Sequence, residues 1–365
     1  MSEHRIAPSV LHQWTFDLWR AAGSNEREAT LVADHLVAAN LAGHDSHGVG
    51  MTPRYVNALL EGDLQLNRAP EIVSDASSLL ILDGRRGLGQ SVAYQAMDIA
   101  IDRAERYGVC VMGLRNAHHI GRVGHWAEQA VKRGMASVHF TNAVSAPAMV
   151  APWGGAQARY LTNPFTVGIA GPRGEPIVLD FATSAIAHGK VRILYNKREK
   201  APAACLIDAR GRPTDDPAVM FEPPEGPRGA LLPFAAHKGY ALAMICELLG
   251  AALTGGETTR PENMRMQSAI WNNMLTIVFD PRRLGPGDRF ETEARSFIEW
   301  VKSAPLSGTI DEILMPGDPE RRTRAARADG IPVDSGTLEQ LDEASAVIAR
   351  SKGSSPGPLS RKVQR

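Results

Sequence analysis

The sequence predicts an α/β protein in which a layered core of strands and helices carries a helical N-terminal segment. Residues 7–62 hold apolar side chains at helical spacing, whereas short apolar runs of strand length take over from Leu79 onward. Longer helix-like stretches separate these runs. Alternation of this kind is typical of a sheet covered by helices.

The N-terminal segment divides into three expected helices. Apolar sets at turn spacing mark the first two, namely Val10, Leu11, Trp14 and Leu18, then Leu31, Val32, Leu36 and Val37. Asn25 with Glu28 predicts a capping box at the start of the second helix, and Gly43 predicts its end. Pro53 suits the first turn of a third helix. The second helix therefore ends just before the sequence HDSHG at 44–48.

The core follows the same rules of periodicity. Strands are expected at 79–82, 109–114, 136–140, 165–170, 177–181, 205–207 and 274–279. Helices are expected at about 90–107, 122–133, 183–194, 238–253 and 291–304, then a charged one at 320–328 and an amphipathic one at 337–350. The Pro- and Gly-rich residues 210–230 form either a functional loop or a plain connector.

Four parts follow from this pattern. They are the helical segment 1–75, which packs on the core together with the C-terminal helices, the α/β core 76–310, the C-terminal loop and helices 311–350, and the tail 351–365. The tail is basic, rich in serine and without acidic residues, so we expect it to be disordered.

Composition excludes several classes of function. The 365 residues hold 40 Lys plus Arg and 40 Asp plus Glu, so no basic excess is present to bind nucleic acid. The most apolar long stretch, 239–253, is interrupted by Glu247, which disfavours a membrane span, and the start of the chain lacks a secretory apolar region. Cys110, Cys205 and Cys246 lie in apolar surroundings and predict the reduced, buried thiols of a cytoplasmic protein.

Glycines after the first strand are the nearest approach to a dinucleotide motif. Gly84, Gly87 and Gly89 lie in DGRRGLGQSV, but Val92 stands where the fingerprint needs its third glycine. No acidic residue closes a second strand nearby. Rossmann binding is therefore unsupported, and Walker A, GxSxG and HExxH sequences are absent as well.

Histidines cluster in two places, and His47 makes the sharper case. His44 and His47 would share a face if their helix continued, which is the geometry of metal ligands, but no Glu or Cys completes the set, so we expect no metal. A metal-dependent hydrolase or lyase stays open as an alternative. Between Ser46 and Gly48, His47 is either a proton donor to a developing alkoxide or a surface histidine at a helix C-terminus.

Two further segments carry polar groups at element ends. In AHHIGRVGHW at 117–126, Gly121 and Gly124 are expected to leave backbone amides free for an anion, with Arg122 adding charge; the same glycines could instead permit close helix packing. Asp180 in LDFATSAIAHGK ends a strand. It either orients a catalytic or cofactor group or caps the helix expected from 183.

Several segments together resemble one known family. AANLAGHDSHGVGMTPRYV, NAHHIGRVGHWAEQA, LTNPF, VLDFATSAIAHGK, HKGYALAMICELLG and MPGD occur in the order typical of the type 2 malate/L-lactate dehydrogenases. The resemblance runs from about residue 5 to residue 345. It implies a nicotinamide-binding fold unrelated to the Rossmann domain, of the L-sulfolactate dehydrogenase-like kind, which accounts for the failed glycine fingerprint.

The resemblance also implies an activity. Members of the family are similar in being homodimers that use NAD or NADP to interconvert 2-oxo acids and 2-hydroxycarboxylates, or cyclic imino acids and their reduced forms. Substrates such as 2-oxoglutarate, aryl-pyruvates and malate- or lactate-like acids are implied. Some imino-acid reductases of the family carry Asp near the position of Lys190, which makes the imino-acid alternative less favoured here.

Site residues are implied position by position. His47 matches the proton donor, and Ser46 matches the residue that orients it. Cofactor contacts are implied for His119, Gly121, Arg122, Val123, Val178, Leu179, Asp180, Phe181, Ala182, His237, Lys238, Asn273, Gly317, Asp318, Pro319 and Glu320. His119 is also a candidate substrate contact. Neighbouring Asn272 competes with Asn273 for the match, and Asp318 stands where the family usually has Glu.

One departure from the family concerns the substrate carboxylate. Many relatives carry an arginine four residues after the catalytic histidine, and this chain has Met51 there. A bidentate contact is lost at that position. Arg54, Arg115 or Arg122 is expected to substitute, and apolar Met51 is expected to favour a bulkier or aromatic substrate side chain.

Overall fold

A seven-stranded sheet forms the centre of the computed structural model, which describes residues 3–223, 226–264, 266–285, 287–308 and 310–363. In spatial order the strands are β2 (Glu71–Ala76), β3 (Leu79–Asp83), β4 (Val109–His118), β11 (Trp271–Phe279), β5 (Ala136–Val144), β6 (Pro164–Ala170) and β7 (Pro176–Ala182). Only β3 and β4 pair in parallel; α4 joins them as a crossover. The sheet is therefore mixed and mostly antiparallel.

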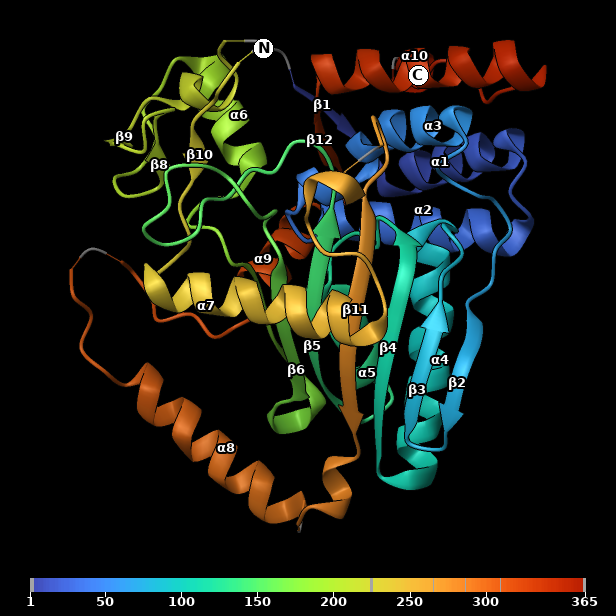
Figure 1. The fold of residues 1–365 in the computed structure, drawn as a ribbon. Helices are drawn as coiled ribbons and strands as arrows, with labels where there is room; N and C mark the ends of the chain where they lie inside the picture. Colours follow the sequence, from blue (N-terminus) through green and yellow to red (C-terminus); the bar gives the residue numbers. More distant parts are fainter. Residues whose placement is uncertain (1–2, 224–225, 265, 286, 309, 364–365) are drawn as a thin grey trace.

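Helices cover both faces of this sheet (Figure 1). The helices α4 (Gly89–Tyr107) and α5 (Gly124–Lys132) pack on one face, and α7 (His237–Ile245) crosses the other. Buried apolar residues of α4, such as Val92 and Met97, form one core with Met112 of β4. Burial of such side chains supplies the main driving force for this layering.

A second layer joins the two ends of the chain. It contains the N-terminal helices α1 (Pro8–Ala22), α2 (Glu26–Leu41) and α3 (Thr52–Glu61), the C-terminal helix α10 (Ser335–Lys352), and a ribbon of β1 (Glu3–Ile6) paired with β12 (Ile331–Asp334). Trp14, Trp19 and Tyr55 share one buried cluster with Leu341. The helical layer is thus built from residues more than 300 positions apart in sequence.

The tail differs from its expectation. Leu359 is fully buried in the same cluster, its backbone N–H donates to the Asp342 carboxylate at 2.5 Å, and the short helix α11 (Ser360–Val363) follows it. Trp14 donates its indole N–H to the Gly357 carbonyl at 2.9 Å. The prediction of disorder was wrong for the described part of the tail, because composition does not show that a single leucine finds an apolar pocket.

Three smaller features complete the fold. A small sheet of β8 (Leu206–Ile207), β9 (Pro213–Thr214) and β10 (Ala230–Leu231) lies beside α6 (His188–Lys197). The arm helix α8 (Gly287–Lys302) buries none of its residues, and Figure 1 shows it standing away from the body. Helix α9 (Asp318–Ala326) follows it in sequence. In the described ranges, no helix combines the length and apolarity needed to cross a membrane.

The apolar runs predicted the core strands well, and the misses have local causes. The strands predicted between 79 and 279 are all present, and Asn25 caps α2 by accepting from the Glu28 N–H at 2.9 Å. The helix expected from 183 begins only at His188, because the Thr183 hydroxyl bonds back to the carbonyls of residues 162 and 163. Strand β2 was missed because its residues are all exposed.

Candidate active site

The segment HDSHG leaves the end of α2 and forms a 3₁₀ turn, Asp45–His47. Gly43, at φ 85°, ends the helix, so the face that His44 and His47 would share on a continued helix does not exist. The Ser46 hydroxyl lies 3.0 Å from Nδ1 of His47. His47 is partly exposed and Ser46 is exposed.

His119 meets His47 from the end of β4. The two imidazole rings are stacked, with centroids 5.5 Å apart and planes 23° apart. Tyr55 of α3 places its hydroxyl 2.5 Å from Nδ1 of His119, and Gln90 of α4 donates its amide N–H to the same hydroxyl at 3.1 Å. Since Gln90 donates, the Tyr55 proton is free for Nδ1, which leaves the His119 proton on Nε2.

Tyr55 and Gln90 were missed by the sequence analysis. Tyr55 is 64 residues from His119, and although it lies in the segment AANLAGHDSHGVGMTPRYV it was given no role there. Its burial raises the pKa of the phenol well above its usual range, so Tyr55 remains a neutral hydrogen-bonding group at all working pH values. The apolar spacing of α3 marks Tyr55 as a core residue and does not show that its hydroxyl reaches His119.

Arg54 supplies the positive charge of this site. Its guanidinium donates to the Ser268 carbonyl at 2.6 Å and to the Ser145 hydroxyl at 2.7 Å. After the larger effect of burial, Arg54 is one of the charges that lower the pKa of His118 and His119, so it lies close to both rings. Arg54 is thus beside the histidine pair.

The other two candidate arginines are held elsewhere. Arg115 pairs with Asp83 at 3.0 Å. Arg122 is buried and pairs with Glu128 at 2.5 Å. Met51 is half-buried and packs on the N-terminal core cluster. Of the residues expected to compensate for Met51, Arg54 therefore has the most suitable position.

The amides of the Gly121–Gly124 segment are occupied by the protein itself, which corrects the expectation of a free anion site. The Gly124 N–H donates to the Asp180 carboxylate at 2.8 Å, and the Arg122 N–H donates to Nε2 of His35 at 3.0 Å. A Cβ on Gly121 would lie 2.1 Å from that nitrogen, so glycine is needed here for the backbone to pack against the His35 ring. Asp180 accordingly caps the start of α5 and not the helix that follows its own strand.

A small cavity of about 60 Å³ lies between α5, β7 and α9. Its lining comprises Arg122, Glu128, Pro176, Val178, Asp180, Gly317, Glu320, Arg321 and Arg324. Five of these were expected cofactor contacts: Arg122, Val178, Asp180, Gly317 and Glu320. Nη1 of Arg122 is buried without a hydrogen-bond partner in the described part of the chain, so this wall retains an unused donor.

The cavity adjoins the histidine turn. Asp180 and Arg122 both act on the pKa of His47, the first raising it and the second lowering it, after the larger effects of burial and His44. Glu320 lines the cavity and also accepts from Nε2 of His44 at 3.0 Å. The residues expected to hold a cofactor and the residue expected to move a proton are therefore neighbours.

Other expected cofactor contacts are not gathered at the cavity. Strand alternation sends Leu179 and Phe181 to the opposite face from Val178 and Asp180, and Phe181 packs edge-on against Phe234. The expected cofactor contacts that do not line the cavity are His119, Gly121, Val123, Leu179, Phe181, Ala182, His237, Lys238, Asn273, Asp318 and Pro319. His237 and Lys238 are exposed at the start of α7.

Asn273 and Asn272, the two candidates for one cofactor contact, both make hydrogen bonds within the protein. Asn273 donates to the Asn142 side chain at 2.9 Å and accepts from the Asn116 N–H at 2.9 Å. Asn272 accepts from the Ile120 N–H at 2.9 Å. Both side chains are buried with their polar atoms engaged, so neither is available to a cofactor without rearrangement.

Burial sets the protonation state of the histidine pair. Loss of hydration, followed by the nearby His44, lowers the pKa of His47 to about 4. Burial and the neighbouring His47 lower the pKa of His119 well below its usual range. Both rings are therefore neutral at pH 7, and each offers an Nε2 that makes no hydrogen bond to any residue the structure describes.

The positions of His44 and His47 do not favour the alternative of a metal-dependent enzyme. His44 turns toward Glu320 of α9, whereas His47 turns toward His119. Across the described residues, no three His, Cys, Asp or Glu side chains come together in a way that could hold a metal ion.

The profile of the Malate/L-lactate dehydrogenase family matches residues 6–342. Hydroxycarboxylate dehydrogenase B of Escherichia coli (strain K12) is 47% identical over 350 residues, covering 95% of each chain. The solved sulfolactate dehydrogenase of Methanocaldococcus jannaschii superimposes with a TM-score of 0.84 at 32% identity, covering 96% of this chain and 98% of that one. This agreement confirms the expected fold class.

A second similar structure is named for a different reaction. The Δ1-piperideine-2-carboxylate reductase of Pseudomonas syringae superimposes with a TM-score of 0.79 at 29% identity, covering 93% of this chain and 99% of that one. The three matches each span more than nine-tenths of both chains.

Proposed function

The chain belongs to the malate/L-lactate dehydrogenase family, and on that premise we propose that it is an NAD(P)-dependent 2-hydroxycarboxylate dehydrogenase. The reaction interconverts a 2-oxo acid and a 2-hydroxy acid, and the bound nicotinamide supplies or accepts the hydride. The observation that carries the proposal is the stacked pair of His47 and His119, whose Nε2 atoms lack partners in the described structure.

His47 is the acid-base group of the proposed reaction. In reduction it gives a proton to the substrate oxygen, and in oxidation it takes the hydroxyl proton back. Ser46 holds the ring through Nδ1, which leaves Nε2 to give its proton from the protonated ring in reduction and to take the proton with the neutral ring in oxidation. His119 carries its proton on Nε2 through the bond from Tyr55 and donates to the same oxygen, which polarises the carbonyl.

Arg54 binds the substrate carboxylate in this proposal. Two of its donors are fixed by Ser268 and Ser145, which holds the guanidinium plane in one orientation beside His119. Met51 adds apolar surface in the neighbouring turn. The proposed substrates are 2-oxo acids with a side chain larger than that of pyruvate, such as 2-oxoglutarate or an aryl-pyruvate.

The lining of the small cavity is the proposed binding surface for part of a nicotinamide dinucleotide, NAD or NADP. The carboxylates of Asp180 and Glu320 would be able to accept hydrogen bonds from ribose hydroxyls. Nη1 of Arg122, buried and unpaired within the described residues, is suited to donate to a cofactor oxygen. Val178 and Gly317 provide apolar and backbone surface on the same walls. These five residues are the ones proposed to bind the cofactor.

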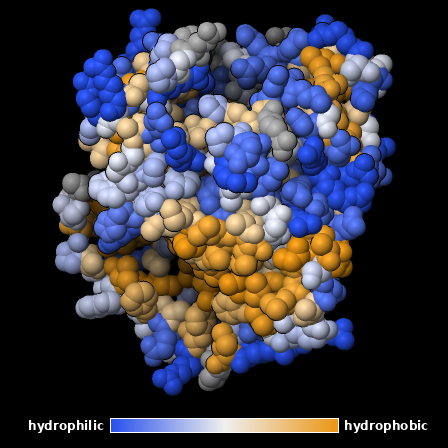
Figure 2. Space-filling model, viewed as in Figure 1, coloured by the Kyte–Doolittle hydropathy of each residue, from blue (hydrophilic) through white to orange (hydrophobic). Residues whose placement is uncertain are grey.

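A homodimer accounts for the exposed apolar surface. Figure 2 shows a broad hydrophobic area on the face that α7 crosses. Exposed apolar residues of α7, the turns after it and α8 include Met244, Ile245, Leu248, Leu253, Phe290, Phe297 and Trp300. Patches of this kind are usually covered by a partner, and a second copy of the chain is the proposed one. Size-exclusion chromatography with light scattering tests this, and Leu248→Asp is expected to shift the mass toward the monomer.

The proposed compartment is the cytoplasm. Cys110, Cys205 and Cys246 are free and buried, and burial raises the pKa of each thiol, so none is set up for disulfide exchange.

Oxidation of NADH and of NADPH by purified protein tests the reaction class. The panel contains pyruvate, oxaloacetate, 2-oxoglutarate, phenylpyruvate and hydroxyphenylpyruvate, and turnover with at least one of them is expected. The structural likeness to the piperideine-carboxylate reductase favours one second candidate, a cyclic imino-acid reductase. Turnover of Δ1-piperideine-2-carboxylate, with no activity on the five 2-oxo acids, would replace the first proposal by the second.

A further inference from the structure

We propose that Arg327, at the C-terminal end of α9, is a positioning residue for His47 and acts through Asp45. The inference rests on the proposed acid-base role of His47. Neither Arg327 nor Asp45 belongs to the residues expected from the sequence to bind substrate or cofactor. Both nevertheless make the contacts that fix the turn on which His47 lies.

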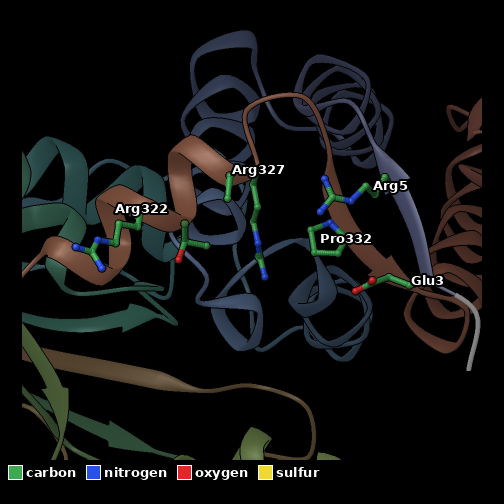
Figure 3. A pocket seen from close by; sticks show the side chains of 7 residues that line it. Glu3, Arg5, Arg322, Arg327 and Pro332 are labelled. Atoms are coloured by element: carbon green, nitrogen blue, oxygen red, sulfur yellow. The ribbon is translucent and has the colours of Figure 1, made fainter. Parts of the chain in front are cut away.

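Arg327 binds the Asp45 carboxylate through both terminal nitrogens of its guanidinium. Nη1 donates to Oδ1 of Asp45 at 2.8 Å and to the Asn40 carbonyl at 2.5 Å, while Nη2 donates to Oδ2 of Asp45 at 3.1 Å. The Arg327 side chain is only 17% exposed. Figure 3 shows Arg327 and Arg322 pointing in different directions from the helix. The planar fork of arginine matches a carboxylate in this way, which lysine cannot reproduce.

Asn40 braces the same turn from the end of α2. Its amide N–H donates to Oδ1 of Asp45 at 2.7 Å, and its Oδ1 accepts from the Val49 N–H at 2.8 Å. A Cβ on Gly48 would lie 2.2 Å from Oδ1 of Asn40, so the close approach of the backbone to this side-chain amide requires glycine. Asp45 and Val49 bracket Ser46 and His47, so the turn is held on both sides of the histidine.

A second bond ties the turn to the same helix. Nε2 of His44 lies 3.0 Å from Oε1 of Glu320, which belongs to the first turn of α9. The start of the turn is therefore anchored to α9 twice, through His44 and through Asp45. The side chains of Ser46 and His47, in contrast, bond to each other and not to α9. This arrangement fixes the backbone while it leaves the imidazole available to a substrate.

Loss of Arg327 is expected to act on the chemical step. Asp45 would keep only its bond from Asn40, and the turn could shift by a fraction of an ångström. A misplacement of about 1 Å in a catalytic group costs about 100-fold in rate. Arg327→Met should therefore lower kcat by about 10- to 100-fold, while KM for the 2-oxo acid and Kd for NADH, followed by NADH fluorescence, stay within about threefold.

Two variants calibrate this effect. Arg327→Lys keeps the charge but loses the fork, so it should recover part of the lost kcat. Arg322→Met is the matched control, because Arg322 lies on the same helix and pairs with Glu312 at the surface. It should keep kcat within about twofold of the unmodified protein. If Arg327→Met fails to fold, Asp45→Asn removes the other half of the fork and should show the same split between kcat and KM.

The His47→Asn background separates positioning from general damage. If Arg327 acts through His47, Arg327→Met should have no further effect on the residual rate of His47→Asn. An equal fractional loss in both backgrounds, or an unchanged kcat in Arg327→Met alone, overturns the inference and leaves the proposed function intact. Full activity of His47→Asn would instead overturn the proposed role of His47 itself, and this inference with it.

Discussion

His139 in the middle of the sheet is fully buried and His47 in the turn after α2 is partly exposed, and only His47 is proposed to act in catalysis. Burial lowers the pKa of His139 to about 3 and that of His47 to about 4, so both are neutral at pH 7. His139 bonds to the hydroxyls of Thr276 and Ser137, each at 2.9 Å. His47 bonds only through Nδ1 among the described residues.

The comparison shows that a displaced pKa does not by itself mark a functional histidine. The low dielectric of a core displaces any imidazole, whether structural or catalytic. What separates the two is the ring nitrogen left without a partner and the second histidine stacked beside it. The predictions below test whether that difference has the consequences proposed for it.

Replacement of His47 should have the largest effect. His47→Asn removes the proton donor while the Ser46 side of the turn stays in place, so kcat should fall by about 100- to 10,000-fold. Binding of NADH, measured by fluorescence, should persist. His12→Asn, on an exposed face where His12 pairs with Asp34, is the control and should keep full activity. Activity of His47→Asn within about threefold of the unmodified protein would remove His47 from the mechanism.

The pH dependence should fall almost wholly on the direction of reduction. With the pKa of His47 lowered to about 4, the free enzyme carries the neutral base above that pH, so kcat/KM for oxidation of the hydroxy acid should be flat from about pH 5 to 8. Reduction needs the protonated ring, so its kcat/KM should fall by about tenfold for each pH unit over the same range. A bend near pH 6.5 in the oxidation profile would show that the ring is not displaced.

Tyr55→Phe should have an intermediate effect. The variant keeps the aromatic ring in its buried site but removes the hydroxyl that donates to Nδ1 of His119. The His119 proton is then free to occupy either nitrogen, and we expect kcat to fall by about tenfold with a smaller change in KM. Nitrogen NMR of labelled His119 should show the loss of the single tautomer; one unchanged tautomer with full activity would contradict the assignment.

His139 should affect stability and not catalysis. A histidine with a pKa of about 3 in the folded state and about 6.5 in the unfolded state lowers the free energy of unfolding as pH falls below about 6.5, by about 1.4 kcal/mol per pH unit. His139→Gln cannot take up this proton, so its free energy of unfolding should fall less steeply between about pH 6 and 4. Urea unfolding at several pH values measures the slope, and His12→Gln serves as the exposed control.

Met51→Arg should give the smallest effect, a change in substrate ranking of a few-fold. The added guanidinium would lie near the site that already holds Arg54, so dicarboxylic and small acids should gain relative to phenylpyruvate. Comparison of kcat/KM across the substrate panel measures the ranking. An unchanged order would show that Met51 does not face the substrate.

Sequence reasoning reached the strands and the turn that carries His47 because both depend on local pattern. Apolar runs identified the sheet, and Gly43 and the spacing of HDSHG placed His47 just after a helix end. The motif also identified Asp180, although the helix that Asp180 caps is α5 and not the one that follows its own strand. Asp180 caps α5 because β7 lies beside that helix in the fold, and no local pattern contains this pairing.

The remaining site residues depend on contacts between distant parts of the chain. Tyr55 reaches His119 from α3, and Gln90 of α4 donates to the Tyr55 hydroxyl; each looks like an ordinary helical residue in the sequence. Arg327 lies 282 residues from Asp45 and follows a helix that the sequence marks only as charged surface. Periodicity assigns a face to such side chains, but it does not identify the segment that packs against that face.

Transfer of deuterium tests the central claim most directly. The protein would be given NADH or NADPH deuterated at C4 of the nicotinamide, together with the best 2-oxo acid of the panel, and the product examined by mass spectrometry. The account predicts a 2-hydroxy acid that is one mass unit heavier, with the deuterium at C2, and loss of this product in His47→Asn. A product without deuterium at C2, or no product with either cofactor, would contradict it.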